Sequence, residues 1–95
     1  MHDEARGIEA QRVLENPLYQ EAFKTIESHI VSQLSQIELP KDRAEYLRSL
    51  LIANRKVRGY LEQAMVTGKF AEQERERQTR FEKAREAVSS LFSRY

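Results

Sequence analysis

Hydrophobic positions recur at spacings of three and four along most of the chain, a pattern that predicts helices and no strands. One such run follows Pro17 and extends to Ile37, and a second runs from about residue 42 to residue 66. A shorter run over residues 3–15 predicts a helix at the N-terminus. We therefore expect an all-α fold.

Two prolines mark the boundaries between these helices. Asn16 is a favourable cap residue, and Pro17 suits the first helical position because it has no N–H to leave unpaired. Pro40 lies in a short link, after which Asp42 is the predicted cap of the next helix. Because links this short usually join antiparallel neighbours, residues 17–66 are predicted to form a helical hairpin.

The third helix is predicted to end at Thr67 and Gly68, because glycine suits the left-handed position that follows many helices. Between Phe70 and Phe81 only one residue is apolar, so this part of the last helix is expected to reach solvent or a charged partner. The prediction is one helical domain, 1–95, made of an N-terminal helix (1–15), the hairpin (17–66) and a long charged C-terminal helix (69–95) that contacts a neighbouring subunit.

The third helix has the most regular pattern and includes one polar position, Asn54. Its apolar seam is predicted to be Leu47, Leu50, Asn54, Val57, Leu61 and Ala64. A buried asparagine in such a seam sets the register between helices at a cost in stability. Its partner is then Gln33 of the second helix or Asn54 of a second chain; the alternative is a partly exposed position at the edge of the core.

A second feature of this helix is a strip formed by Ile52, Gly59 and Val66 on its outer side. A glycine inside a helix costs about 0.5–1 kcal/mol relative to alanine. Three readings stay open: close approach of a partner helix, approach of a phosphate, or a tolerated glycine. Apolar spacing resumes in the last helix, so the residues predicted to form protein interfaces are Ile52, Gly59, Val66, Phe81, Val88, Leu91 and Tyr95.

Composition favours an oligomer, because 40% of the 95 residues are hydrophobic and 33% are charged, which leaves little material for a core. Residues 1–47 carry five basic and nine acidic side chains, whereas residues 48–95 carry eleven and six. The two halves therefore attract each other, within one chain or between chains. The alternative use of the basic half is nucleic-acid binding, for which the candidates are Arg48, Arg55, Lys56 and Arg58.

No set of residues predicts catalysis or metal binding. The two histidines, His2 and His29, have no carboxylate at helical spacing that would complete a metal site, and no phosphate-binding loop is present. Cysteine is absent, no apolar run is long enough for a membrane span, and the acidic N-terminus is not that of a signal peptide. We expect a cytoplasmic protein that is not an enzyme and needs no cofactor.

Two stretches, "RVLENPLYQEAF" (12–23) and "VRGYLEQAMVTGK" (57–69), resemble a group of small helical proteins of tailed bacteriophages and prophages. The resemblance implies a gene in the head-assembly or DNA-packaging region, and no site residue carries over. The expected function is a non-enzymatic assembly or packaging accessory protein that forms a homo-oligomer, contacts phage structural or packaging proteins, and is present in the host cytoplasm or the virion. The alternatives are a DNA-binding packaging recognition subunit or regulator, and an inhibitor of a host protein.

Overall fold

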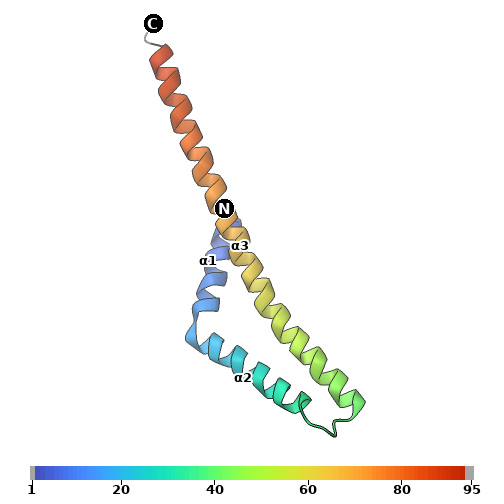
Figure 1. Cartoon of the computed structure of the whole chain (residues 1–95). Coiled ribbons are helices and arrows are strands. Elements are labelled where there is room, and N and C mark those ends of the chain that lie inside the picture. The colour runs from blue at the N-terminus through green and yellow to red at the C-terminus, as the bar shows by residue number, and fades with distance from the viewer. Residues whose placement is uncertain (1, 94–95) are drawn as a thin grey trace.

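A computed structural model describes residues 2–93, and within them the chain forms three helices and no strand. These are α1 (His2–Glu15), α2 (Pro17–Leu34) and α3 (Lys41–Phe92), shown in Figure 1. The predicted all-α fold and helical hairpin are confirmed.

The 52-residue helix α3 is the element against which the other two pack. Glu4 of α1 meets Arg75, whereas Glu27 of α2 meets Arg55, so both shorter helices run antiparallel to α3, one after the other. Figure 1 shows that α1 and α2 meet at a bend that lies away from α3. The molecule is therefore a helical hairpin in which the shorter side is broken into two helices.

The bend between α1 and α2 follows from local chemistry at Asn16. Its side-chain Oδ1 accepts hydrogen bonds from the backbone N–H groups of Leu18 (2.9 Å) and Tyr19 (3.1 Å). Pro17 occupies the first position of α2, where its missing N–H leaves nothing unpaired. The predicted boundary is confirmed, including the role of Asn16 as cap.

The second helix is shorter than predicted, because α2 ends at Leu34 and not at Ile37. The Ser35 hydroxyl donates to the carbonyl of Val31 at 2.9 Å, and the Ser35 N–H donates to the same carbonyl at 3.1 Å. Serine side chains compete with the helix for backbone partners in this way. Beyond that point Ile37 is fully exposed, at 101%.

The start of α3 also differs from the prediction. The helix begins at Lys41 directly after Pro40, and no side chain caps it. The prediction that Asp42 is the cap residue was therefore wrong. Asp42 lies instead within the first turn of α3, where a negative charge favours the positive end of the helix.

The prediction that a helix ends at Thr67 and Gly68 was wrong, because α3 continues through both residues to Phe92. Gly68 does not take the left-handed conformation, since no glycine of the described residues has a positive φ. It is instead buried inside the helix. The physical reason is a contact with α1, described below, which needs a glycine at this position of a regular helix.

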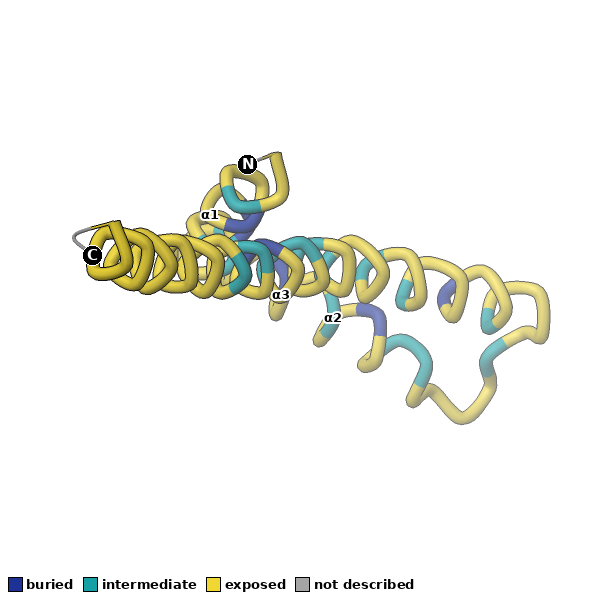
Figure 2. The backbone as a smooth tube through the Cα atoms, turned by 90° about the horizontal axis from the view of Figure 1, so that it is seen from above, coloured by how far each residue is buried: buried dark blue, intermediate teal, exposed yellow. Residues whose placement is uncertain are grey.

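The core is small and the molecule is elongated. Only four hydrophobic residues of the described chain are buried, namely Ala10, Phe23, Ile30 and Leu47. Figure 2 shows in dark blue that buried positions are few along the chain. The radius of gyration is 23.2 Å, against about 12–13 Å for a compact chain of this length. The accessible surface is 8117 Å², against about 5,700 Å² expected for a compact protein of this mass.

The seam of α3 differs from the predicted one at two positions. Leu50 and Val57 are exposed, at 39% and 59%, while their neighbours Leu51 and Arg58 are half-buried. Arg58 is covered because its guanidinium lies over the Phe23 ring of α2, 4.7 Å from the ring centroid. The covered positions of α3 are Ala44, Leu47, Leu51, Asn54, Arg58, Leu61, Ala64, Met65, Gly68, Ala71 and Glu74.

Candidate protein-interaction surface

Helices α1 and α3 cross with their backbones in contact at Gly7 and Gly68. A Cβ atom added to Gly68 would lie 2.6 Å from Cα of Gly7 and 2.7 Å from the carbonyl oxygen of Asp3. A Cβ atom on Gly7 would lie 2.7 Å from Cα of Gly68. Neither position therefore accepts another residue unless the helices move apart. Gly7 was not among the predicted interface residues. The sequence did contain a signal for it, because Gly7 and Ala10 are small residues three positions apart and so lie on one side of α1.

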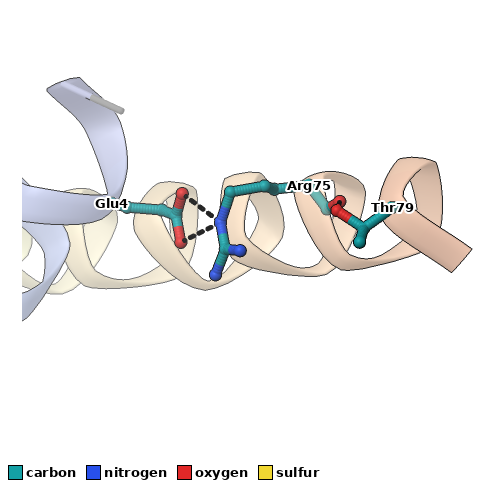
Figure 3. Close-up of polar contacts among 3 residues, drawn as sticks. All are labelled: Glu4, Arg75 and Thr79. Carbon is teal, nitrogen blue, oxygen red and sulfur yellow. Dashed lines mark hydrogen bonds and ion pairs between the residues drawn. The ribbon is translucent and has the colours of Figure 1, made fainter.

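An ion pair holds the start of α1 to α3 just beyond this crossing (Figure 3). Arg75 Nε lies 3.1 Å and 3.0 Å from the two carboxylate oxygens of Glu4. These hydrogen bonds, and then the negative charge of Glu4, raise the pKa of the Arg75 guanidinium above its usual value. After this pair, residues 76–92 of α3 are exposed at every position. We call residues 76–92 the arm.

The attraction expected between the acidic and basic halves is present within the single chain. Arg55 Nη2 lies 2.6 Å from Glu27 Oε1, and Arg75 pairs with Glu4 as described. In addition, Arg6 donates a hydrogen bond to the hydroxyl of Tyr60 at 2.7 Å. Part of the charge asymmetry is thus used to hold α1 and α2 on α3.

The four candidate nucleic-acid-binding residues do not form one patch. Arg55 is paired with the α2 carboxylate, and Arg58 lies over the Phe23 ring. Arg48 and Lys56 are exposed, but their directions on the helix differ by about 80° at 100° per residue. Of the four candidates, only Arg48 and Lys56 are therefore left without a partner described above, and these two point in different directions.

Gly59 has a different environment from Gly68. A Cβ atom added to Gly59 would meet no atom within 4 Å. The glycine lies in an open, shallow groove on α3. Two residues that line it also reach the shorter helices, since Arg55 pairs with Glu27 of α2 and the Tyr60 hydroxyl accepts a hydrogen bond from Arg6 of α1. The groove is lined by Ile52, Arg55, Lys56, Gly59, Tyr60 and Gln63. No backbone of the described residues approaches it, so if the glycine admits a partner, the partner belongs to another molecule.

The groove and the apolar stripe of the arm lie on one face of α3. Because the helix is continuous through Gly68, its phase carries over from one region to the other. At 100° per residue, the apolar positions of the arm lie within about 40° of the direction of Gly59. Phe70, 65% exposed, lies between the two regions in the same direction. We call this set the outer face: Ile52, Gly59, Val66, Phe70, Phe81, Ala84, Val88 and Leu91.

Every member of the outer face is exposed. The sequence pattern indicated two separate stripes only because a helix end was predicted between them. Phe70 was not among the predicted interface residues, and its spacing of four from Val66 is the signal that marks it. Tyr95, which was predicted to extend the stripe, lies outside the described residues.

Asn54 is the one polar side chain on the predicted seam of α3. Its Nδ2 atom is buried and has no hydrogen-bond partner among residues 2–93. Gln33, one of its predicted partners, lies instead within hydrogen-bond distance of His29 Nε2 (3.0 Å) and Arg43 (3.4 Å). A buried amide without a partner costs about 1–3 kcal/mol. The role of Asn54 in setting register stays a prediction.

The described residues hold no group of three or more side chains that would bind a metal ion. Among those same residues, no helix has both the length and the hydropathy that crossing a membrane requires. A comparison with protein-family models gave no match, and searches of curated proteins and of solved structures gave no similar protein. The candidate site is therefore defined by the geometry of α3.

Proposed function

We propose that this chain is a non-enzymatic assembly protein that forms a homo-oligomer through helix–helix contacts. The observation that carries the proposal is the outer face, which is exposed from Ile52 to Leu91. At 1.5 Å per residue this is a length of about 60 Å. A monomer keeps few exposed apolar positions in one continuous line, whereas a partner helix would cover such a line.

The arm supports the same proposal. It covers residues 76–92, and the exposure of every one of these positions means that neither α1 nor α2 covers it. Most of the stability of a helix in a protein comes from packing of its apolar face and not from helix propensity. A helical arm with a regular apolar stripe is therefore best explained by packing against another molecule.

The resemblance to small proteins of tailed bacteriophages supports a more specific role in head assembly or DNA packaging. We propose that the oligomer acts there as an accessory protein, in the host cytoplasm or in the virion. Fractionating phage particles tests this role. We expect the protein to co-purify with heads or packaging intermediates, and its absence from both would contradict this role.

Sedimentation equilibrium of the full chain at tens of micromolar tests self-association. We expect a species larger than a monomer, and replacement of Val88 by glutamate should shift it to monomer because a charge would be buried in the contact. Lys83→Glu is the matched control, since Lys83 lies on the same helix about 120° from the outer face. A monomeric wild-type chain would contradict the proposed function.

Duplex-DNA binding by a packaging recognition subunit or regulator is the alternative. It is less well supported because Arg55 and Arg58 are already engaged within the chain. Titrating duplex DNA as salt rises from low to physiological concentration separates the two functions. A measurable affinity that falls steeply with salt supports DNA binding, and no binding at low salt removes it. Inhibition of a host protein would appear as a partner captured from uninfected lysate.

A further inference from the structure

We propose that a second copy of the chain packs antiparallel along the outer face, with Phe81 of each copy in the groove over Gly59 of the other. This inference rests on the proposed self-association and specifies its geometry. The positions that carry it, Ile52, Gly59, Phe81 and Val88, are all exposed. The argument depends on their spacing, on the shape of the groove and on the charges near it.

The spacing of the outer face fits a two-fold axis at Phe70. In the sequence Phe70 lies midway between Gly59 and Phe81, and it also lies midway between Ile52 and Val88. An antiparallel partner therefore places Phe81 opposite Gly59 and Val88 opposite Ile52 at the same time. On each helix the two contact positions are one heptad apart, or about 10.5 Å along the axis, so one register satisfies both contacts.

The groove at Gly59 fits an aromatic ring. Gly59 has no neighbour within 4 Å of where a Cβ atom would be, so the floor of the groove is bare backbone. Ile52 and Tyr60 line it with apolar surface, and the aliphatic parts of long cationic side chains can cover a ring. In the antiparallel register, the aromatic residue of the outer face that lies opposite Gly59 is Phe81. This contact gives a reason for a glycine that costs stability in the monomer.

Between Ile52 and Leu91, two charged residues, Arg55 and Arg77, lie within about 40° of the direction of Gly59 at 100° per residue. Arg55 is paired with Glu27 of its own chain, which leaves Arg77. The antiparallel register places it opposite Gln63, which lines the groove and whose amide oxygen accepts hydrogen bonds from a guanidinium. A parallel two-fold pair would instead place Arg77 against Arg77 of the other copy. The charge within the face therefore favours the antiparallel arrangement.

Charges at the edges of the outer face add one attractive and one repulsive pair, all of exposed side chains, so they do not decide between the arrangements. At 100° per residue Glu62 and Arg80 lie on the same edge, on opposite sides of the two-fold axis, so each Glu62 faces an Arg80 of the other copy. Glu62 also lies 3.7 Å from Arg58 of its own chain. A parallel partner would leave Gly59 facing Gly59, with no ring for the groove. The antiparallel pairing brings Lys56 near Arg85 on the other edge, where both side chains are exposed and screened by salt.

The exposed surface of the chain is sufficient for such a contact. The accessible surface of 8117 Å² exceeds that of a compact protein of this mass by about 2,400 Å². A standard specific interface buries about 800 Å² on each partner. The outer face supplies surface of the required kind, since four of its large apolar side chains are at least 60% exposed, namely Val66, Phe70, Phe81 and Leu91.

Cysteine cross-linking tests the register, because the natural chain has no cysteine. A disulfide needs Cα atoms about 4.4–6.8 Å apart, and in this geometry Phe70 approaches its own copy at the two-fold axis. We expect Phe70→Cys to form a disulfide-linked dimer with itself under mild oxidation. Val88→Cys alone should stay monomeric on a non-reducing gel but should cross-link when mixed with Ile52→Cys. Val57→Cys, similarly exposed but on another face, is the control that should not cross-link.

Each outcome decides between the arrangements. Self-cross-linking of Val88→Cys would show a parallel pair and would overturn the inference. An oligomer by sedimentation that gives no Phe70→Cys dimer also overturns it, while the proposed self-association stands. A monomer by sedimentation contradicts the proposed function itself. As a second test, Gly59→Leu should weaken association about tenfold or more by filling the groove while leaving helicity intact, and unchanged association would overturn the inference.

Discussion

Two glycines in the same helix, Gly59 and Gly68, have opposite surroundings. Gly68 touches the backbone of Gly7, so close that a Cβ atom on either would overlap the other helix. Gly59 has nothing near it. In the first case the reason for the glycine is visible inside the chain, where α1 crosses α3. By analogy, we infer that the glycine of the outer face also serves a helix crossing, one that only a second molecule can provide.

The same contrast separates the two parts of α3. From Lys41 to Arg75 one side of the helix is covered by α2 and then by α1, and ion pairs join the three helices. From residue 76 to residue 92 every position is exposed, although apolar residues still recur at helical spacing. The arm therefore has the sequence pattern of a packed helix without a packing partner in the described chain.

The largest expected effect comes from replacing Gly68 by leucine. Its Cβ atom would lie 2.6 Å from the backbone of Gly7, and no side-chain rotation relieves a clash with backbone. We expect α1 to separate from α3 and the free energy of unfolding to fall by about 1–3 kcal/mol. Urea unfolding followed by circular dichroism measures this. The matched control is Gly59→Leu, which should lose little stability, and equal losses for both variants would refute the contrast.

A smaller effect is expected for alanine at the two glycines. Gly59→Ala should raise the free energy of unfolding by about 0.5–1 kcal/mol, because alanine is less flexible than glycine in the unfolded chain and a methyl group meets nothing in the fold. Gly68→Ala should lower it, since the methyl group would overlap Gly7. Urea midpoints at a protein concentration too low for association would give both values. Changes of the same sign would contradict the account.

The smallest effect is expected at the ion pair that precedes the arm. Arg75→Ala should lower the free energy of unfolding only slightly, because the Arg75 side chain is 56% exposed and exposed ion pairs contribute little. Folding raises the pKa of Arg75. The stabilisation that the Glu4–Arg75 pair gives to the fold is therefore complete at any pH below the pKa of Arg75 in the unfolded chain. It is lost only in strong alkali, as pH rises through the higher pKa of the folded chain. Arg77→Ala, which within one chain removes only a contact with Glu74 in the same helix, is the control at a protein concentration too low for association. A loss for Arg75→Ala as large as that for Gly68→Leu would contradict this expectation.

The features that sequence predicted well depend on local chemistry. The bend at Asn16 and Pro17 is specified by the cap and the proline themselves, so it needed no knowledge of the fold. The end predicted at Gly68 failed because a glycine after a helix and a glycine at a helix crossing look alike in sequence. Only the position of Gly7, in a different helix near the start of the chain, distinguishes the two cases.

The seam of α3 shows a second limit. Leu50 and Leu51 are adjacent and both apolar, so either fits a spacing of three and four, and the structure places Leu51 on the covered side. Arg58 was predicted as a candidate for nucleic-acid binding, yet its guanidinium lies on the Phe23 ring. Most residues of the outer face were predicted as interface residues. Their arrangement as one continuous face was not predicted, because it requires α3 to continue through Gly68.

Amide hydrogen exchange of the full chain at two protein concentrations tests the central claim most directly. Peptides that cover residues 52–66 and peptides that cover residues 81–91 should gain protection together as the concentration rises, because each region packs on the other in the second copy. Residues 2–15 should change little, since α1 is held within the chain. Protection that does not depend on concentration, or that rises in only one of the two regions, would contradict the claim that the outer face is the surface of self-association.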